Sequence, residues 1–232
     1  TLLRQLKTVL APHGRRSGEI LFEGRNLDSL DQREQAEKIG VVRQSTENQI
    51  VTDKVWHELA FGLEYLGYNT PTIRRRVAEM ASFFGIQEWF YKPVTELSGG
   101  QKQLLNLASV MVLQPKVLIL DEPTSQLDPI AASDFLATLG KINRELGTTI
   151  ILTEHRLEEA FSFASCVAVM DGGKLLCTGT PAEVGAELKS SGNAMFLAMP
   201  AAMRIWAIRS RRKQKRTGHG NRCLGAGTLV QV

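Results

Sequence analysis

The segment VLILDEPTSQLD, residues 117–128, joins an apolar run to two consecutive carboxylates, Asp121 and Glu122. A continuous apolar run such as 117–120 is typical of a strand buried on both faces of a parallel sheet. The two acids then lie at the carboxyl edge of that sheet, where α/β proteins bind ligands. Strand alternation directs Asp121 and Glu122 to opposite sides, and Pro123 is expected to end the strand.

This acid pair has two interpretations. One carboxylate can hold Mg²⁺ through its water shell, while its neighbour orients or deprotonates an attacking water. The alternative is an ordinary pair of surface acids at the end of a strand. The segment taken alone favours neither.

The pattern on either side of the segment predicts an α/β fold. Residues 52–112 are mostly helical in pattern, and a further helix is expected near 130–146. An amphipathic helix is expected over residues 1–10. Strands are predicted at EILFEG (19–24), within KIGVVRQ from Ile39 to Arg43, and at TTIILTEH (148–155), CVAVMDGG (166–173) and KLLCTG (174–179). This order indicates a layered α/β core with a helical block inserted into it.

A second feature is LSGGQKQ, residues 97–103. Ser98 can cap the helix that follows, and Gly99 and Gly100 let backbone N–H groups approach an anion closely. A helix start without bulky side chains is therefore a candidate phosphate site. A plain Ser-Gly-Gly turn and helix cap is the alternative.

Two polar residues follow other predicted strands. His155 comes directly after TTIILTE and could contact a γ-phosphate or the attacking water, although a lone His is more often structural. Gln44 follows the predicted strand IGVVR and could offer its carbonyl oxygen to Mg²⁺ and its amide to water.

The order of these features resembles the ATP-binding cassette (ABC) ATPases. That family has a Q-loop, a signature, a Walker B strand, a D-loop and an H-loop, which match Gln44, LSGGQ, the Asp121–Glu122 strand, SQLD and His155. The resemblance covers residues 1 to about 185. It implies a P-loop NTPase-type (RecA-like) core with a mainly parallel sheet, a small antiparallel β part and a helical signature subdomain. The expected ATPase domain is 1–187, and 188–232 is expected to be a linker and a basic, disordered tail.

The resemblance also implies roles for the residues around one ATP. Asp121 would help to hold Mg²⁺, and Glu122 would be the catalytic base. His155 would contact the γ-phosphate. Gln44 would take part in catalysis and couple Mg²⁺ to a membrane partner.

Further roles concern a second cassette, which would form a homo- or heterodimer with this one. The signature residues Ser98, Gly99, Gly100 and Gln101 would bind ATP held by that cassette. Asp128 would lie at the dimer interface, near the Walker A loop of the partner.

In this family a Walker A loop, G-x-x-x-x-G-K-[ST], stands directly before a helix, and TLL commonly follows it. Thr1 would then be the residue just after the Mg²⁺-binding Ser or Thr. The phosphate-clamping Lys is therefore expected upstream of the printed chain. The 232-residue chain alone is expected to bind ATP weakly and to hydrolyse almost none.

Composition places the chain among ordinary soluble proteins, with 43% hydrophobic and 22% charged residues. The net charge of +4 comes from the segment 188–232, which has nine Lys or Arg and no acid. Its run RSRRKQKR could touch nucleic acid or anionic lipid, and a solvated disordered tail is the simpler interpretation.

The three cysteines, Cys166, Cys177 and Cys223, form no CxxC pair and suit a reducing cytosol. The longest apolar stretch, Phe196–Ile208, contains Pro200 and Arg204 and is too short to span a bilayer.

Residues 47–67, ENQIVTDKVWHELAFGLEYLG, indicate the kind of cassette protein. They resemble the segment after the Q-loop in energy-coupling-factor and cobalt-type importers of vitamins and metal ions, many of which have N-P where this chain has Ser45–Thr46. The resemblance implies a peripheral protein at the cytoplasmic face of the plasma membrane, with a separate transmembrane subunit and no nucleic-acid partner. Several apolar residues of this segment could equally be core positions of the helical block.

Two other functions stay open. One is a soluble ABC ATPase of DNA repair or translation, in which the basic tail would bind nucleic acid; such proteins usually carry long insertions, and none appears here. The other is a cassette fragment that does not hydrolyse ATP. The presence of Glu122 and His155 argues against the latter.

Overall fold

The computed structural model describes residues 18–45, 49–155, 157–209 and 228–231. They belong to two compact units, 1–121 and 122–232, so the division falls between Asp121 and Glu122. The predicted helix at 1–10, together with Thr1, lies outside the described residues.

The first unit begins with a small hairpin. Strands β1 (Leu21–Phe22) and β2 (Arg25–Asn26) pair antiparallel. Glu23 and Gly24 both have positive φ, 51° and 76°, which is the geometry of a type I′ hairpin turn. The 3-10 turn η2 (Leu27–Ser29) and the helix α2 (Gln32–Lys38) follow. The sequence predicts one strand over 19–24; the observed strands are shorter because the chain turns at Glu23.

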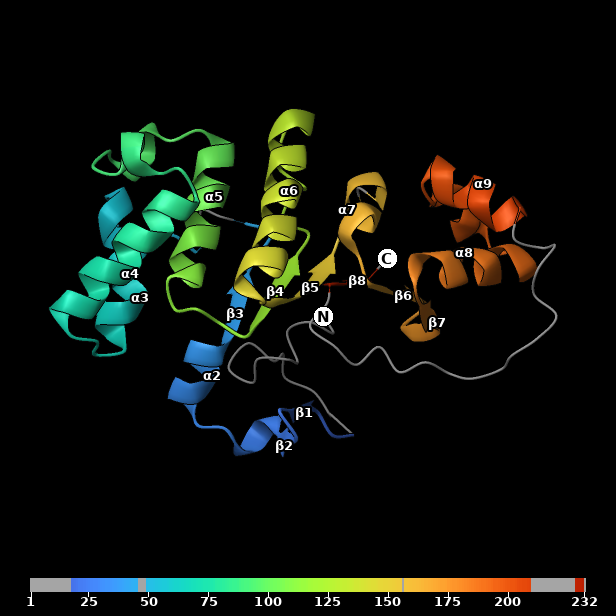
Figure 1. Cartoon of the computed structure of the whole chain (residues 1–232), viewed down its shortest axis with the longest axis horizontal. Helices are drawn as coiled ribbons and strands as arrows, with labels where there is room; N and C mark the ends of the chain where they lie inside the picture. The colour runs from blue at the N-terminus through green and yellow to red at the C-terminus, as the bar shows by residue number, and fades with distance from the viewer. Residues whose placement is uncertain (1–17, 46–48, 156, 210–227, 232) are drawn as a thin grey trace. The chain divides into compact units, whose positions relative to one another are not determined.

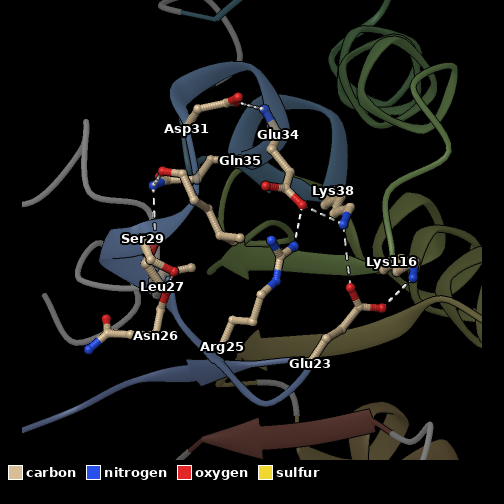
Figure 2. Close-up of polar contacts among 11 residues, drawn as sticks. Glu23, Arg25, Asn26, Leu27, Ser29, Asp31, Glu34, Gln35, Lys38 and Lys116 are labelled. Carbon is tan, nitrogen blue, oxygen red and sulfur yellow. Dashed lines mark hydrogen bonds and ion pairs between the residues drawn. The ribbon is translucent and has the colours of Figure 1, made fainter.

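A chain of alternating charges ties this hairpin to α2 and to Lys116, the residue before the strand β4 (Val117–Asp121) (Figure 2). Lys38 Nζ lies 2.7 Å from Glu34 Oε1 and 3.4 Å from Glu23 Oε2. Arg25 also pairs with Glu34, and Lys116 with Glu23. We call these five residues the hairpin charge network. Its hydrogen bonds lower the pKa of the Glu23 carboxyl, chiefly through Lys116. They also lower the pKa of Glu34, chiefly through Lys38.

Strand β3 (Ile39–Val42) pairs in parallel with β4, and Val42 lies opposite Leu120. The signature helix α5 (Gly99–Met111) packs directly on β3. At Gly40 of β3, an added Cβ would overlap the Val110 side chain, so only glycine allows this close approach. The contact fixes α5 to the strand that leads to Gln44.

The helical block lies between β3 and β4 along the chain. It consists of α3 (Val55–Tyr65), α4 (Thr70–Phe83) and α5, which pack on one another. The 3-10 turns η3 (Gln87–Trp89) and η4 (Val94–Glu96) connect α4 to α5. Figure 1 shows these helices as a group, as the sequence predicts for residues 52–112.

The second unit consists of strands and helices in alternation. Its helices are α6 (Pro129–Leu146), α7 (Leu157–Phe163), α8 (Pro181–Ser190) and α9 (Ala201–Arg209), with a 3-10 turn η5 (Ala194–Ala198). Its strands are β5 (Thr149–Thr153), β6 (Cys166–Asp171), β7 (Lys174–Gly179) and β8 (Thr228–Gln231). Strand β8 lies between β5 and β6 and is parallel to both, while β7 pairs antiparallel with β6.

The C-terminal region contains regular elements where the sequence predicts a linker and a disordered tail. Helix α9 extends to Arg209, and residues 228–231 form a strand. A short segment of ordinary polarity gives no strand signal by itself, because its pairing with β5 and β6 is a long-range contact. Most of the basic run lies outside the described residues.

One core of this unit gathers side chains of α7, α8, β6 and β7, among them Phe161, Val167 and Leu188. Cys166 and Cys177 are free and buried, as the sequence predicts for small core residues. Burial raises the pKa of the Cys177 thiol. Among the described residues, no helix is long and apolar enough to cross a bilayer.

Candidate active site

In the first unit, Gln44 and Asp121 lie at neighbouring strand ends. Asp121 is the last residue of β4, and Gln44 follows β3 by two residues. Because Val42 and Leu120 are in register, both residues belong to the same carboxyl edge. This is the edge at which the sequence predicts a ligand site.

A second glutamine, Gln49, holds the loop that carries Gln44. Its Nε2 donates to the Val41 carbonyl at 2.7 Å, and its Oε1 accepts from the Arg43 N–H at 2.9 Å. Asn106 Nδ2, on the signature helix α5, also donates to Gln49 Oε1, at 3.2 Å. Gln49 therefore links the loop to α5. The sequence analysis includes Gln49 in the importer-like segment 47–67 but gives it no role in holding the loop, because its partners Val41 and Asn106 are not evident from the sequence pattern.

In the second unit, the structure brings Glu122 and His155 together. His155 Nε2 lies 3.2 Å from Glu122 Oε1, which is a hydrogen bond when Nε2 carries the proton. The His155 side chain is 81% exposed and that of Glu122 33% exposed. A carboxylate and an imidazole that face solvent side by side can together position a water molecule and receive its proton.

The backbone of Glu122 differs from the sequence prediction. The strand β4 ends at Asp121, and Glu122 adopts a left-handed conformation with φ of 46°. Strand alternation therefore does not set the direction of its side chain, and Pro123 is not what ends the strand. The Glu122 N–H instead donates to the Thr153 carbonyl at 3.1 Å and lies 3.0 Å from Thr153 Oγ1. A non-glycine residue held in this conformation is a feature that clusters at functional sites.

Two buried residues next to this pair in the sequence, Thr124 and Glu154, were not predicted as site residues. Thr124 Oγ1 donates to Glu154 Oε1 at 2.7 Å, and the His155 N–H donates to the same oxygen at 3.1 Å. Thr124 is fully buried and Glu154 is 3% exposed. In the sequence, only the position of Glu154 directly before His155 suggested a role for it. That position does not show whether a carboxylate is buried or at the surface.

The signature residues form an open helix start. Ser98 is the N-cap of α5 and makes a capping box with Gln101: Ser98 Oγ accepts from the Gln101 N–H at 3.3 Å, and the Ser98 N–H donates to Gln101 Oε1 at 3.0 Å. Gly99 is exposed, and an added Cβ there would meet nothing within 4 Å. Packing against the described residues therefore does not explain why glycine occupies this position.

Asp128 is the N-cap of α6, and its Oδ1 accepts from the Ile130 and Ala131 N–H groups at 3.0 Å each. The side chain therefore has a structural role that the sequence analysis did not assign. Its expected place at a dimer interface stays a prediction.

The residues at the carboxyl edge of β3 and β4 fit a bound Mg²⁺ by their chemistry. Asp121 offers carboxylate oxygens and Gln44 an amide oxygen, and hard oxygen ligands are the ones Mg²⁺ prefers. The described residues contain no cluster of three or more His, Cys, Asp or Glu that could form an all-protein cage. Mg²⁺ commonly needs only one or two protein ligands, with water and phosphate completing its octahedron.

Comparison with known proteins defines the class. The family profile described as "ABC transporter" matches residues 1–125, which is more than half of the chain. The chain therefore belongs to the ABC transporter ATP-binding family. Its α/β architecture is that of the P-loop ATPases of this family.

Three individual proteins show which members of this family the chain is similar to. A putative ABC transporter ATP-binding protein of Bacillus cereus is 49% identical over 81% of this chain and 34% of its own length. The energy-coupling factor transporter ATP-binding protein EcfA1 of Symbiobacterium thermophilum is 38% identical over 88% of this chain and 69% of its own length. The solved structure of cbiO1 from Clostridium perfringens, part of the ABC transporter complex cbiONQ, has a TM-score of 0.68 and 35% identity, covering 82% of this chain and 76% of that one. The chain spans about a third of the length of the Bacillus relatives it matches.

Proposed function

We propose that the chain is the ATP-binding and ATP-hydrolysing part of an ABC transporter that imports a vitamin or a metal ion through a separate membrane subunit. The observation that carries the proposal is the pair Glu122–His155, with 3.2 Å between Oε1 and Nε2. A signature helix start that is open to solvent supports it. The similarity to EcfA1 and cbiO1 supports the importer class.

In this proposal Glu122 is the general base. Its carboxylate orients the attacking water and takes a proton from it as the oxygen approaches the γ-phosphorus. His155 holds the carboxylate in place and donates a hydrogen bond to the γ-phosphate. Asp121 and Gln44 would hold Mg²⁺, which supplies charge neutralisation on the phosphate oxygens when it is bound.

The signature residues 98–101 would act on ATP held by a second cassette. Backbone N–H groups at a helix N-terminus favour an anion, and the macrodipole adds to this preference. The open space at Gly99 leaves room for a phosphate oxygen from outside the chain. Asp128 and Thr1 would complete the interface and the phosphate site.

The membrane subunit is proposed to dock in the helical block. A groove of about 410 Å³ lies between α3 and α4 and is bordered by the residues after η3. Its walls are mainly apolar, with Trp56, Phe90 and Tyr91 as the large side chains. Tyr91 is 79% exposed, and so is suited to contact with a partner. We therefore expect the protein to be peripheral on the cytoplasmic face of the membrane.

ATP hydrolysis tests the proposal. The printed sequence contains no G-x-x-x-x-G-K-[ST] motif, so the assay protein carries a family P-loop joined ahead of Thr1. We call it the P-loop-joined chain. It is expected to hydrolyse ATP with Mg²⁺ at least about a hundredfold faster than the 232-residue chain, because the loop supplies the phosphate-binding N–H groups and Lys. Equal rates for the two proteins would contradict the proposal.

The partner is tested separately by purification. The chain should be recovered with a membrane subunit from detergent-solubilised membranes, and Tyr91→Asp should reduce that recovery. Retention of nucleic acid instead of a membrane protein would favour the DNA-repair or translation alternative.

A further inference from the structure

A buried carboxylate, that of Glu154, accepts hydrogen bonds from the backbone of His155 and from Thr124, two residues after Glu122. The residue is 3% exposed, and its partner Thr124 is fully buried. Burying a carboxylate is costly unless hydrogen bonds compensate it. A surface acid or an apolar residue would avoid that cost, so the contacts of Glu154 require an explanation.

One oxygen of Glu154 joins two segments of the chain. Thr124 Oγ1 donates to Oε1 at 2.7 Å, and the His155 N–H donates to the same Oε1 at 3.1 Å. Thr124 lies two residues after Glu122, and the Leu127 N–H donates to its carbonyl at 3.0 Å. The carboxylate therefore connects the turn that follows Glu122 to the backbone of His155.

A second hydrogen bond also links the segment of Glu122 to the segment of His155. The Glu122 N–H donates to the Thr153 carbonyl at 3.1 Å. Thr153 is the last residue of β5 and Glu154 follows it, so these two consecutive residues accept hydrogen bonds from Glu122 and Thr124, respectively. These two links join residues 122–124 to residues 153–155, and so couple the position of Glu122 to that of His155.

We propose that Glu154 is a positioning residue for hydrolysis, which holds Glu122 and His155 in register through Thr124. The inference rests on the proposed function, because it assumes that the Glu122–His155 pair acts on ATP. A displacement of about 1 Å in a catalytic group can cost about a hundredfold in rate. Loss of the Glu154 acceptor should therefore affect turnover more than it affects ATP binding.

The test uses Glu154→Gln, Glu154→Leu and Thr124→Val in the P-loop-joined chain. Glu154→Leu removes the acceptor and should lower kcat at least about tenfold, with KM for ATP within about twofold of the parent. Glu154→Gln keeps an Oε1 acceptor and should restore kcat to within about threefold of the parent. Thr124→Val should lower kcat as Glu154→Leu does. The variant that combines Thr124→Val with Glu154→Leu should have a kcat no lower than that of either single variant.

Amide hydrogen exchange gives a readout that does not need hydrolysis. The His155 N–H should exchange at least about tenfold faster in Glu154→Leu than in the parent, and at the parental rate in Glu154→Gln. The matched control is Glu158→Ala, which removes an exposed carboxylate of the neighbouring helix α7. It should change neither kcat nor the exchange of His155.

The outcomes separate the two proposals. A P-loop-joined chain that hydrolyses no ATP would contradict the proposed function, while the exchange experiment would still be readable. A folded Glu154→Leu protein with parental kcat would overturn the positioning role, and so would a Glu154→Gln protein as impaired as Glu154→Leu. If Glu154→Leu does not fold, Thr124→Val decides, because it leaves Glu154 in place; parental kcat in that variant would overturn the proposal.

Discussion

At position 99, neither packing against the described residues nor helix propensity explains the choice of glycine. Gly99 is the first residue of α5, is exposed, and has empty space where a side chain would begin. Alanine is a better helix former than glycine by up to about 1 kcal/mol. Neither helix propensity nor packing against the described part of the chain therefore accounts for glycine at this position.

We predict that Gly99→Ala in the P-loop-joined chain folds with unchanged or slightly higher stability and loses at least about tenfold in ATP turnover. The methyl group would occupy the space that a phosphate oxygen of ATP on the second cassette needs. Urea unfolding and a phosphate-release assay measure the two effects. The control is Thr95→Ala, at an exposed position three residues before the cap Ser98. Normal turnover by Gly99→Ala would show that the helix start does not meet a phosphate.

The sequence was sufficient to predict the structural position of residues that lie next to a recognisable strand or helix. Asp121 at the end of a buried strand and Ser98 as a helix cap were predicted and are observed in those places. The left-handed backbone of Glu122 was not predictable, because it depends on hydrogen bonds to Thr153, far away in the sequence. Glu154 was missed for the same reason, since its burial depends on Thr124.

Among the elements of the fold, the hairpin and α2 give a prediction of pH dependence through the hairpin charge network. Its acids Glu23 and Glu34 have lowered pKa values, so their contribution to stability is present above the ordinary carboxyl pKa of 4.5 and is lost as the pH falls through their lowered values. The pKa of Lys38 is raised, chiefly by its hydrogen bond to Glu34. The contribution of Lys38 is present below its ordinary pKa of 10.5 and is lost as the pH rises through the raised value.

We therefore predict that Lys38→Met lowers the free energy of unfolding at neutral pH, and that its difference from the parent shrinks as the pH falls through the lowered pKa values of Glu23 and Glu34. High salt should shrink the difference as well, because these side chains are in contact with solvent. Urea titrations at several pH values measure it, with the exposed Lys92→Met as control. A difference that stayed constant from neutral to acid pH would mean that Lys38 acts through contacts that do not depend on these acids, for example the cation–π contact of its Nζ with the Phe22 ring.

Strand β8 gives a second prediction about the elements. Residues 228–231 occupy the position between β5 and β6, with Leu229 opposite Cys166. Paired residues of adjacent strands lie within the range of Cα separations that a disulfide spans. In a chain with Cys177→Ser and Cys223→Ser, Leu229→Cys should form an oxidative crosslink to Cys166, detectable by peptide mass spectrometry. The control Val230→Cys, which is opposite Val167, should crosslink much less; equal crosslinking of both would contradict this register.

The fold was predictable from the sequence where the pattern is local. Helix α6 and strands β3 to β7 were expected near their observed positions, because continuous apolar runs and Gly-bounded turns indicate them. The two-residue strands β1 and β2 and the strand β8 are different. Their pairing is set by a turn or by distant partners, which single-sequence patterns do not report.

The proposed working molecule is an assembly in which two cassettes enclose ATP. In that assembly the carboxylate of Glu122 and the imidazole of His155 come from one cassette, and the signature helix start of α5 comes from the other. A chain that binds ATP but cannot cleave it should therefore stay paired with its partner. Nucleotide-dependent dimerisation is thus the property of the whole molecule that follows most directly from the proposed site.

Glu122→Gln in the P-loop-joined chain tests this property. Glutamine keeps the shape of the side chain but cannot accept the proton of the attacking water, so ATP should bind without being cleaved. Size-exclusion chromatography with light scattering should then find a dimer with ATP and Mg²⁺, and a monomer without nucleotide. A variant that turned over ATP at the parental rate, or that remained monomeric with ATP bound, would contradict an ATP site shared between two cassettes.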